Sequence, residues 1–354
     1  MIKKVFRMMA LFAVIFSFAY AAVGSGTPSQ HMARVALGGT TLALVPTTGN
    51  MLWMYTAFKT IYDEAYNKQI PDYDKIALIV PSSAKRESYE WLGAFPKMRQ
   101  WIGSRHVMAL KEKGYIIANL RHEVTVGIPR KDIELDTYGL YRPVIAGMGA
   151  SARLHPDELV FPLLTNGFTS NAYDNLPFFS ASHQCGTNLG TATLTLRDGS
   201  PNVEAYKTAR AAIGRIKDDQ GKPLFTSAAK KLILVVPPEL EEVASHILHD
   251  DFISVSGGST QNNVWKNSAD LLCSPQLSNP TAWFLLVEFM GLRPIIFQQQ
   301  QAPLFVVKNV SQESDHVFME DEFLYGADSF DNAGYSLPQL AYGSSGTVTP
   351  EHGH

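Results

Sequence analysis

A serine and a lysine stand three residues apart in Ser82-Ser83-Ala84-Lys85, a spacing that can support nucleophilic chemistry. In penicillin-binding proteins and β-lactamases a lysine so placed can activate the serine, and KTG and SDN motifs complete the site. Neither motif occurs in this chain, and the SxxK spacing alone is common. We therefore interpret Ser82 and Lys85 as loop residues rather than as a catalytic pair.

Two further groups contain residues of the types that bind metals. His183 and Cys185 lie two positions apart, but no further ligand stands nearby at a spacing typical of zinc sites, which favours a loop histidine and a buried thiol. An acidic run could bind calcium or perform acid–base chemistry, but apolar residues are interleaved with it, which favours a strand or turn with a solvated polar face. The run comprises Asp315, His316, Glu320, Asp321 and Glu322.

Motifs for other chemistries are missing from the sequence. There is no GxSxG, HExxH or Walker-type loop, and Gly257-Gly258 follow no strand that opens into a helix. His352 and His354 belong to a polar tail. The sequence therefore predicts no catalytic residue, no cofactor and no metal, and it favours a structural or binding protein over an enzyme.

The composition allows a large buried core. The 354 residues are 45% hydrophobic and 18% charged, which suits two domains or one compound domain. The net charge of −3 excludes the strongly basic face of a dedicated nucleic-acid binder but not a weak contact with DNA. Cys185 and Cys273 are 88 positions apart and are predicted to be separate reduced thiols; the alternative is one disulfide in an oxidising compartment.

The first residues have the three parts of a secretory signal peptide. Lys3, Lys4 and Arg7 precede an apolar run at 8–23, and Ala19-Tyr20-Ala21 offers a cleavage site. Taken alone, this pattern predicts export.

Met32 supports a different interpretation of the same segment. It opens a stretch that needs no leader, so residues 1–31 could be a mis-called extension that the working protein lacks. Mass spectrometry of the natural protein tests this, and an intact peptide from Tyr20 to Arg34 would exclude the shorter protein.

Hydrophobic periodicity predicts an alternation of helices and strands. Helices are predicted at 51–67, 141–167, 202–217 and 240–248. Strands are predicted at 76–80, 232–236, 283–289, 294–298 and 302–307, with a strand pair at 115–128 and a loop at 256–263. The segment at 141–167 is either one kinked helix or two in line, because Pro156 begins a new helix-start pattern. Its small residues would let another element come close; they are Ala146, Gly147, Gly149, Ala150 and Ala152.

Residues 82–113 mix aromatic and basic side chains and suit a long hairpin with exposed aromatics. A nucleic-acid stacking platform is one interpretation of this mixture. Glu87, Glu90 and Glu112 interrupt the basic run, which favours packing against another chain or the parent domain.

Three linked blocks resemble the major head subunits of Mu-like phages. The first block is Tyr89-Glu90-Trp91-Leu92-Gly93, Phe95-Pro96 and Trp101-Ile102-Gly103. The second is His155-Pro156-Asp157-Glu158-Leu159-Val160-Phe161, Leu163-Leu164, Asn166-Gly167-Phe168, Tyr173-Asp174 and Pro177-Phe178-Phe179. The third is His316-Val317-Phe318-Met319, Glu322-Phe323-Leu324-Tyr325-Gly326, Asn332-Ala333-Gly334-Tyr335 and Gln339-Leu340-Ala341-Tyr342-Gly343. Their order and spacing agree with the family from about residue 70 to 345.

This resemblance implies an α+β chain with the HK97-type fold of tailed-phage capsids. Its parts would be an N-terminal arm (32–74), a peripheral domain (75–201), an axial domain (202–290), a return to the peripheral domain (291–345) and a flexible tail (346–354). The peripheral domain would carry an extended hairpin loop at about 82–128 and a long spine helix at about 141–167.

The resemblance also implies a function without an active site. The chain would self-assemble, as hexamers and pentamers, into the icosahedral shell of a Mu-like phage or prophage in the bacterial host cytoplasm. Its partners would be a scaffold protein, a portal, a decoration protein and, through non-specific contact, the packaged DNA; no membrane contact is expected if the leader is not real. The alternatives are an encapsulin-like compartment and an exported binding protein or hydrolase.

Overall fold

The structure is a computed structural model of the whole chain. It describes residues 48–90, 92, 114–134, 138–197, 200–201, 203–218, 221–225, 231–255, 259–308 and 315–346. The signal-like segment 1–31, the first part of the expected arm, most of the aromatic and basic stretch before residue 114, and the tail beyond residue 346 lie outside the described residues.

A four-stranded sheet forms the framework of the first half of the molecule. Its strands are β1 (Ala77–Pro81), β13 (Ile295–Lys308), β14 (Glu322–Tyr335) and β4 (Leu120–Pro129), in the order β1-β13-β14-β4. β1 runs parallel to β13, and the other neighbours are antiparallel. The two strands predicted at 294–298 and 302–307 are one strand, because β14 pairs along its length and absorbs two register shifts between Gln299 and Leu304.

Two long helices pack on this sheet. α2 (Thr48–Lys68) covers the segment predicted at 51–67, and α5 (Arg142–Asn166) covers the one predicted at 141–167. A Cβ atom on Gly149 of α5 would lie 2.5 Å from the carbonyl oxygen of Tyr62, so only glycine permits this approach of α2. Gly149 therefore lets α2 come close, as the small residues predicted, whereas Gly147 is exposed and a Cβ atom there would have no neighbour within 4 Å. We call the sheet with these two helices the long unit.

The Pro156-Asp157 pattern marks no break in α5, which continues through Pro156 and Pro162. Asp157 instead receives hydrogen bonds from a different segment: its Oδ1 accepts from the backbone N–H of Tyr73 at 2.7 Å and of Asp72 at 3.1 Å. Burial raises the pKa of Asp157, although these two backbone bonds oppose the shift. The carboxylate thereby joins the start of the short helix α3 (Tyr73–Ile76) to α5.

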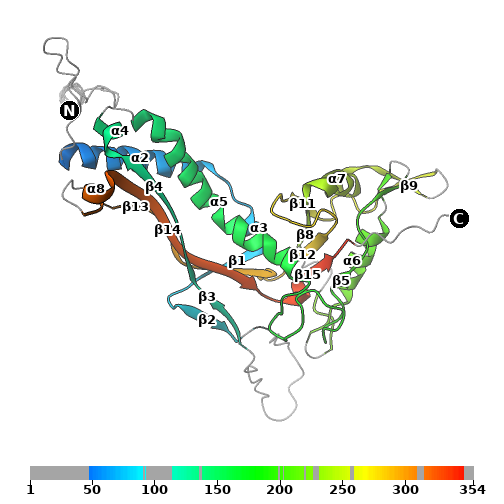
Figure 1. Cartoon of the computed structure of the whole chain (residues 1–354). Helices are drawn as coiled ribbons and strands as arrows, with labels where there is room; N and C mark the ends of the chain where they lie inside the picture. Colours follow the sequence, from blue (N-terminus) through cyan, green and yellow to red (C-terminus); the bar gives the residue numbers. More distant parts are fainter. Residues whose placement is uncertain are drawn as a thin grey trace, which may run out of the picture.

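A second sheet organises the other half of the molecule. Its strands are β5 (Leu189–Gly190), β8 (Lys231–Val236), β11 (Asp270–Cys273), β12 (Trp283–Glu288) and β15 (Ala341–Ser344), in the order β11-β8-β12-β15-β5. Helices α6 (Glu204–Arg215) and α7 (Glu241–His249) pack on one face of it. We call this sheet with its two helices the compact unit; Figure 1 shows it at the far end of α5 from α2.

The central strands of the compact unit are buried on both faces. Alternate residues such as Leu234 and Leu285 face α6 and α7, whereas Val235 and Phe284 face the C-terminal half of α5. This explains why 232–236 and 283–289 are continuous apolar runs without alternation. The second of these cores is shared by both units and joins them.

Three predicted features are corrected by the structure. The loop predicted at 256–263 contains β10 (Ser259–Asn262), which pairs with β9 (Phe252–Val255); its Ser-Thr-Gln-Asn sequence lacks the apolar pattern of a strand. The acidic run begins with a helix, α8 (Asp315–Glu320), and not with a strand or turn. The segment 291–345, expected as a return to the peripheral domain, also contributes β15 to the compact unit, where it pairs with β12.

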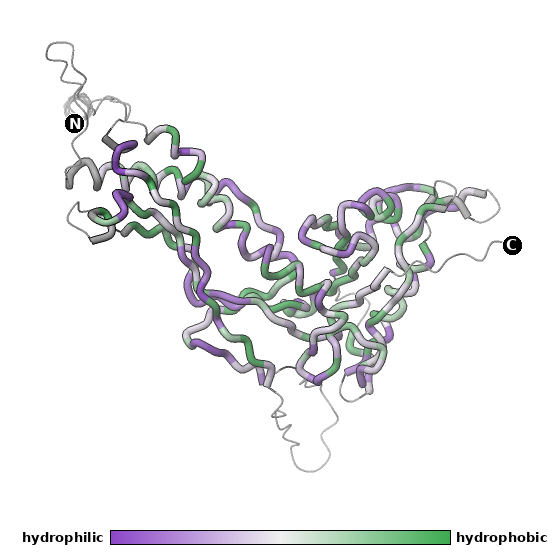
Figure 2. Tube along the Cα trace, in the orientation of Figure 1, coloured by the Kyte–Doolittle hydropathy of each residue, from purple (hydrophilic) through white to green (hydrophobic). Residues whose placement is uncertain are grey.

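The remaining elements connect the two units or lie at their edges. They are β2 (Arg86–Tyr89), β3 (Tyr115–Ala118), α4 (Arg130–Glu134), η2 (Tyr138–Tyr141), β6 (Leu196–Arg197), β7 (Ser200–Pro201), η3 (Pro238–Leu240) and η4 (Pro338–Leu340). β2 pairs with β3 as an antiparallel hairpin beneath the long unit (Figure 1). Figure 2 shows that β2 is mainly hydrophilic and β3 mainly hydrophobic, although Tyr89 of β2 and Ile117 of β3 are both buried and Ile116 of β3 is 60% exposed.

Candidate functional site

The serine and lysine of the SxxK spacing form a turn and not a catalytic pair. Ser82 Oγ lies 2.9 Å from Glu87 Oε1 and 3.0 Å from the carbonyl oxygen of Ala84, and it accepts a hydrogen bond from Asn119 Nδ2 at 2.9 Å. Lys85 is exposed. Hydrogen bonds from Ser82 and from two backbone N–H groups lower the pKa of Glu87, so this carboxylate stays ionised and fixes the turn.

This turn belongs to a buried polar network at the base of the β2–β3 hairpin. Gln298 of β13 is fully buried; its Oε1 accepts a hydrogen bond from the Tyr89 hydroxyl at 2.8 Å, and its Nε2 donates to Asn119 Oδ1 at 2.7 Å. Asn119 Nδ2 also donates to the carbonyl oxygen of Ala84 at 2.8 Å. We call Ser82, Tyr89, Asn119 and Gln298 the hairpin anchor.

The hairpin anchor fixes the orientation of the β2–β3 hairpin relative to the four-stranded sheet. Asn119 is the single residue between β3 and β4, so the network fixes the point at which the chain passes from the hairpin into the main sheet. Asn332 of β14 adds a hydrogen bond to the carbonyl oxygen of Ala118 at 2.7 Å. Because buried hydrogen bonds are directional and costly to break, they hold the hairpin in one orientation.

The sequence prediction missed Asn119 and Gln298. Gln298 begins a run of four glutamines inside an otherwise apolar strand, and a polar residue in such a strand was a signal that it has a buried partner. Of the predicted aromatic surface, Tyr89 is buried in the anchor, whereas Trp91, Phe95 and Trp101 lie outside the described residues.

His183 and Cys185 do not form a metal site. His183 is buried, with Nδ1 2.6 Å from Asp174 Oδ2 and Nε2 3.2 Å from the carbonyl oxygen of Phe178. Both ring nitrogens thus lie next to acceptor oxygens. Cys185 is buried. The pair is a structural feature of the loop after α5.

Replacing Asp174 with Asn is expected to lower the free energy of unfolding by about 1–3 kcal/mol, because it removes a charged hydrogen bond to a buried histidine. Burial acts to raise the pKa of Asp174, but the His183 bond and charge and the Leu176 N–H outweigh it and lower the pKa. The stabilisation is therefore present above the unfolded-state pKa of about 3.9 and is lost as pH falls through the lowered folded-state value. Urea unfolding at a series of pH values measures it.

The exposed pair His246–Asp250, with 2.7 Å between Nδ1 and Oδ2, provides the matched control. Asp250→Asn should change stability by less than about 1 kcal/mol, since exposed pairs contribute little. Equal losses in the Asp174 and Asp250 variants would contradict a special role for the buried pair.

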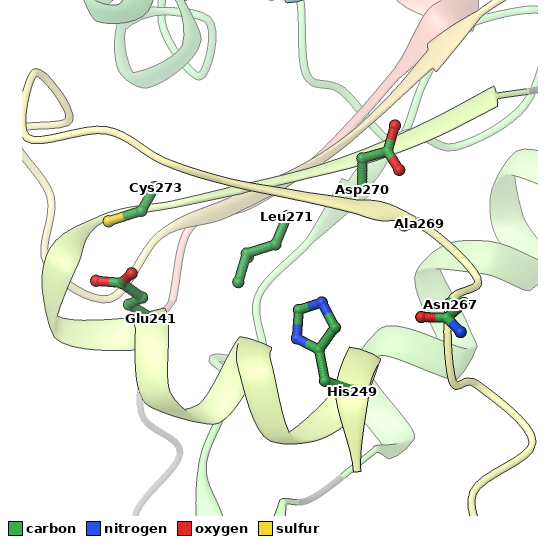
Figure 3. A pocket seen from close by; sticks show the side chains of 7 residues that line it. All are labelled: Glu241, His249, Asn267, Ala269, Asp270, Leu271 and Cys273. Atoms are coloured by element: carbon green, nitrogen blue, oxygen red, sulfur yellow. The ribbon is translucent and has the colours of Figure 1, made fainter. Parts of the chain in front are cut away.

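A pocket of about 460 Å³ opens between α7 and β11 in the compact unit. Figure 3 shows Leu271 and His249 directed into it, with Glu241 close to Cys273 at one end. Burial, reinforced by Glu241, raises the pKa of Cys273 to about 11, so the thiol is not poised as a nucleophile. The pocket thus offers space without an activated group.

Alkylation of Cys273 at pH 8 is expected to be roughly two orders of magnitude slower than that of an unperturbed cysteine, because the thiolate fraction falls with the raised pKa. Iodoacetamide labelling of a Cys185→Ala variant, followed by mass spectrometry, measures the rate. Glu241→Gln should increase it. Labelling as fast as that of free cysteine would show that the thiol is not shielded.

The acidic run lies at the junction of α8 and β14. Glu320 and Asp321 are exposed at the end of α8, and Asp321 has a φ of 54° where the chain turns into β14. Gly257, Gly258, His352 and His354 lie outside the described residues.

Several large apolar side chains are exposed on the described surface. They include Ile70, Leu140, Val264, Met290 and Met319, each at least 75% exposed. They are distributed over both units and do not gather in one groove. No helix within the described ranges is long and apolar enough to cross a membrane.

Comparisons with known proteins agree with the resemblance. The chain matches the family described as Mu-like prophage major head subunit gpT over residues 51–200, 197–277 and 278–353. It is 30% identical to the major capsid protein of Escherichia phage Mu over 86% of this chain and 77% of that one. It is 29% identical to the Mu-like prophage FluMu major head subunit of Haemophilus influenzae, over 84% of this chain and 74% of that one.

Solved structures support the same fold. A subunit of the procapsid of bacteriophage JBD30 superimposes with a TM-score of 0.52 and 28% sequence identity, covering 86% of this chain and 77% of that one. These likenesses confirm the α+β, HK97-type capsid fold expected from the resemblance. By its fold and by a family match that spans most of its length, the chain belongs to the Mu-like prophage major head subunits.

Proposed function

We propose that this chain is the repeating subunit of an icosahedral phage head, that it assembles as hexamers and pentamers, and that the shell encloses DNA. The observation that carries the proposal is the family match, which spans residues 51–353 and therefore includes both units and the hairpin base. A protein of this kind needs contact surfaces and no active site. We accordingly propose a structural role without catalytic chemistry.

The two units would correspond to two domains with different positions in the shell. The long unit, with α5 as its spine, would be the peripheral domain, and the compact unit would be the axial domain that gathers around the symmetry axes. The boundaries at 75–201, 202–290 and 291–345 then need one adjustment, because β5 and β15 pair within the compact sheet.

The exposed apolar residues support subunit contacts at many places. Ile70 and Leu140 belong to the long unit, and Val264 and Met290 to the compact one. A shell subunit has several neighbours, and many modest contacts add up when they form together. The hairpin anchor would hold β2 and β3 in position for contact with one such neighbour.

The further partners are part of the proposal. A scaffold protein, a portal and a decoration protein would act with the subunit in the bacterial host cytoplasm, and the packaged DNA would touch the inner surface without sequence preference. The mild net charge of −3 suits a weak contact of this kind.

Electron microscopy of the expressed protein tests the proposal. The full chain and a chain that begins at Met32 would be produced with and without the scaffold protein, and closed shells are expected in the presence of scaffold. A product that stays monomeric even with scaffold would overturn the proposal. Shells that carry protein cargo and no nuclease-protected DNA during infection would favour an encapsulin-like compartment instead.

A further inference from the structure

Two histidines and an aspartate from three different elements meet beneath α5. His122 lies on β4, Asp331 on β14 and His155 on α5. His122 pairs across the strands with Ser329, and Asp331 follows Ser329 by two positions. The side chains of His122 and Asp331 therefore point to the same face of the sheet. α5 packs on β14, and this packing brings His155 to that face.

The three side chains place possible ligand atoms close to one another. Nε2 of His122 and Nε2 of His155 each lie 3.5 Å from Oδ1 of Asp331, and one possible ligand atom from each residue lies within 4.8 Å of the other two. The two imidazole rings are in contact, with 4.4 Å between their centroids.

Asp331 is the unusual member of this group. Its side chain is 0% exposed, and within the described part of the chain neither of its oxygens accepts a hydrogen bond. Nε2 of His122 and Nε2 of His155 are likewise buried without a hydrogen-bond partner there. A buried carboxylate is strongly disfavoured unless a cation or hydrogen-bond donors compensate it.

We propose that His122, His155 and Asp331 bind a zinc-type divalent cation. Ligand atoms at about 2.0–2.2 Å from a tetrahedral Zn²⁺ are separated from one another by roughly 3.3–3.5 Å. The two N–O separations of 3.5 Å match edges of such a tetrahedron. One cation would satisfy both imidazole nitrogens and Oδ1 of Asp331 at once.

The donor set selects the class of metal. Two imidazole nitrogens and one carboxylate suit Zn²⁺ or Co²⁺, whereas Mg²⁺ and Ca²⁺ prefer sites made of oxygen. A pocket of about 80 Å³ lined by His122, His155 and Ser329 leaves room for a water as the fourth ligand.

The surrounding charges do not compensate Asp331. Arg121 is paired with Asp328 at 2.7 Å, and Glu158 is acidic. Glu158 Oε2 lies 3.9 Å from Nδ1 of His155, which is beyond hydrogen-bond distance. The cation would cross-link α5 to β4 and β14, and this role does not depend on the proposed function.

Metal titration of the full chain tests the site. The parent protein would carry His352→Ala and His354→Ala, because the terminal histidines could chelate metal on their own, and it would first be dialysed against EDTA. Co²⁺ should bind with a stoichiometry of one and give the visible absorption of a tetrahedral complex. Zn²⁺ should displace it and raise the thermal midpoint by several degrees.

Variants separate a metal site from a merely structural cluster. Asp331→Asn and His155→Gln should reduce Zn²⁺ affinity at least tenfold and abolish the thermal shift, whereas His246→Gln on the exposed face of α7 should leave both unchanged. Asp331→Asn should fold at least as well as the parent in EDTA, since it removes a buried charge. Failure of the parent to bind Co²⁺ or Zn²⁺, or undiminished binding by Asp331→Asn, would overturn the proposal and leave an ion pair between Asp331 and protonated histidines.

Discussion

Replacing Phe179 with alanine is expected to lower the free energy of unfolding by about 3–5 kcal/mol and to prevent normal assembly. The side chain is 1% exposed and lies in the core shared by both units. Its ring lies 5.1 Å from Phe168, 5.0 Å from Phe178 and 5.4 Å from Phe284, measured between centroids. The first two follow α5, and Phe284 belongs to β12, so the ring joins the spine helix to the compact sheet.

The residues around Phe179 are packed closely, so they cannot move far enough to fill the cavity that alanine would leave. Cβ atoms placed on Gly167 or Gly343 would lie 2.9 and 2.8 Å from the Phe179 ring, so the ring fills the space that these glycines leave. Urea unfolding of the unassembled subunit, followed by tryptophan fluorescence, measures the loss of stability, and electron microscopy measures assembly. Phe252→Ala, at a side chain that is 60% exposed, is the control. A loss below about 1 kcal/mol for Phe179→Ala would contradict this account of the junction.

Replacing Gln298 with leucine is expected to cost about 2–4 kcal/mol and to loosen the hairpin more than the rest of the molecule. The leucine fits the apolar strand but removes the acceptor of the Tyr89 hydroxyl and the donor to Asn119 Oδ1 that Gln298 provides. Each buried polar group left unsatisfied costs about 1–3 kcal/mol. The loss should therefore exceed that of an ordinary polar substitution in a strand.

Hydrogen exchange distinguishes a loosened hairpin from general destabilisation. In Gln298→Leu, hydrogen exchange should accelerate at β2 and β3 more than at β8 and β12. The variant should also assemble into shells less efficiently than a variant of equal free energy of unfolding. Gln299→Leu is the matched control, because the neighbouring side chain points to the other face of the strand. Uniform acceleration across both sheets would show that the anchor does not act locally.

The sequence alone determined the periodic elements. The apolar spacing in 141–167 and 240–248 and the apolar runs at 232–236 and 283–289 correspond to α5, α7, β8 and β12. These segments are long or strongly apolar, so local pattern and burial agree. The family blocks were also visible in the sequence, and the block at 155–179 is the junction around Phe179.

Only the tertiary structure decided which elements share a sheet and which polar residues meet. β15 pairs with β12, which lies more than 50 residues before it in the chain. Nothing in the short sequence of β15 specifies that partner. β10 is a strand because β9 lies beside it, although its own residues are polar. His122, His155 and Asp331 are far apart in sequence with no common spacing, and the packing of α5 on β14 and β4 brings them together. Pairing across a fold depends on contacts between distant segments, and a linear pattern records only the local part of that information.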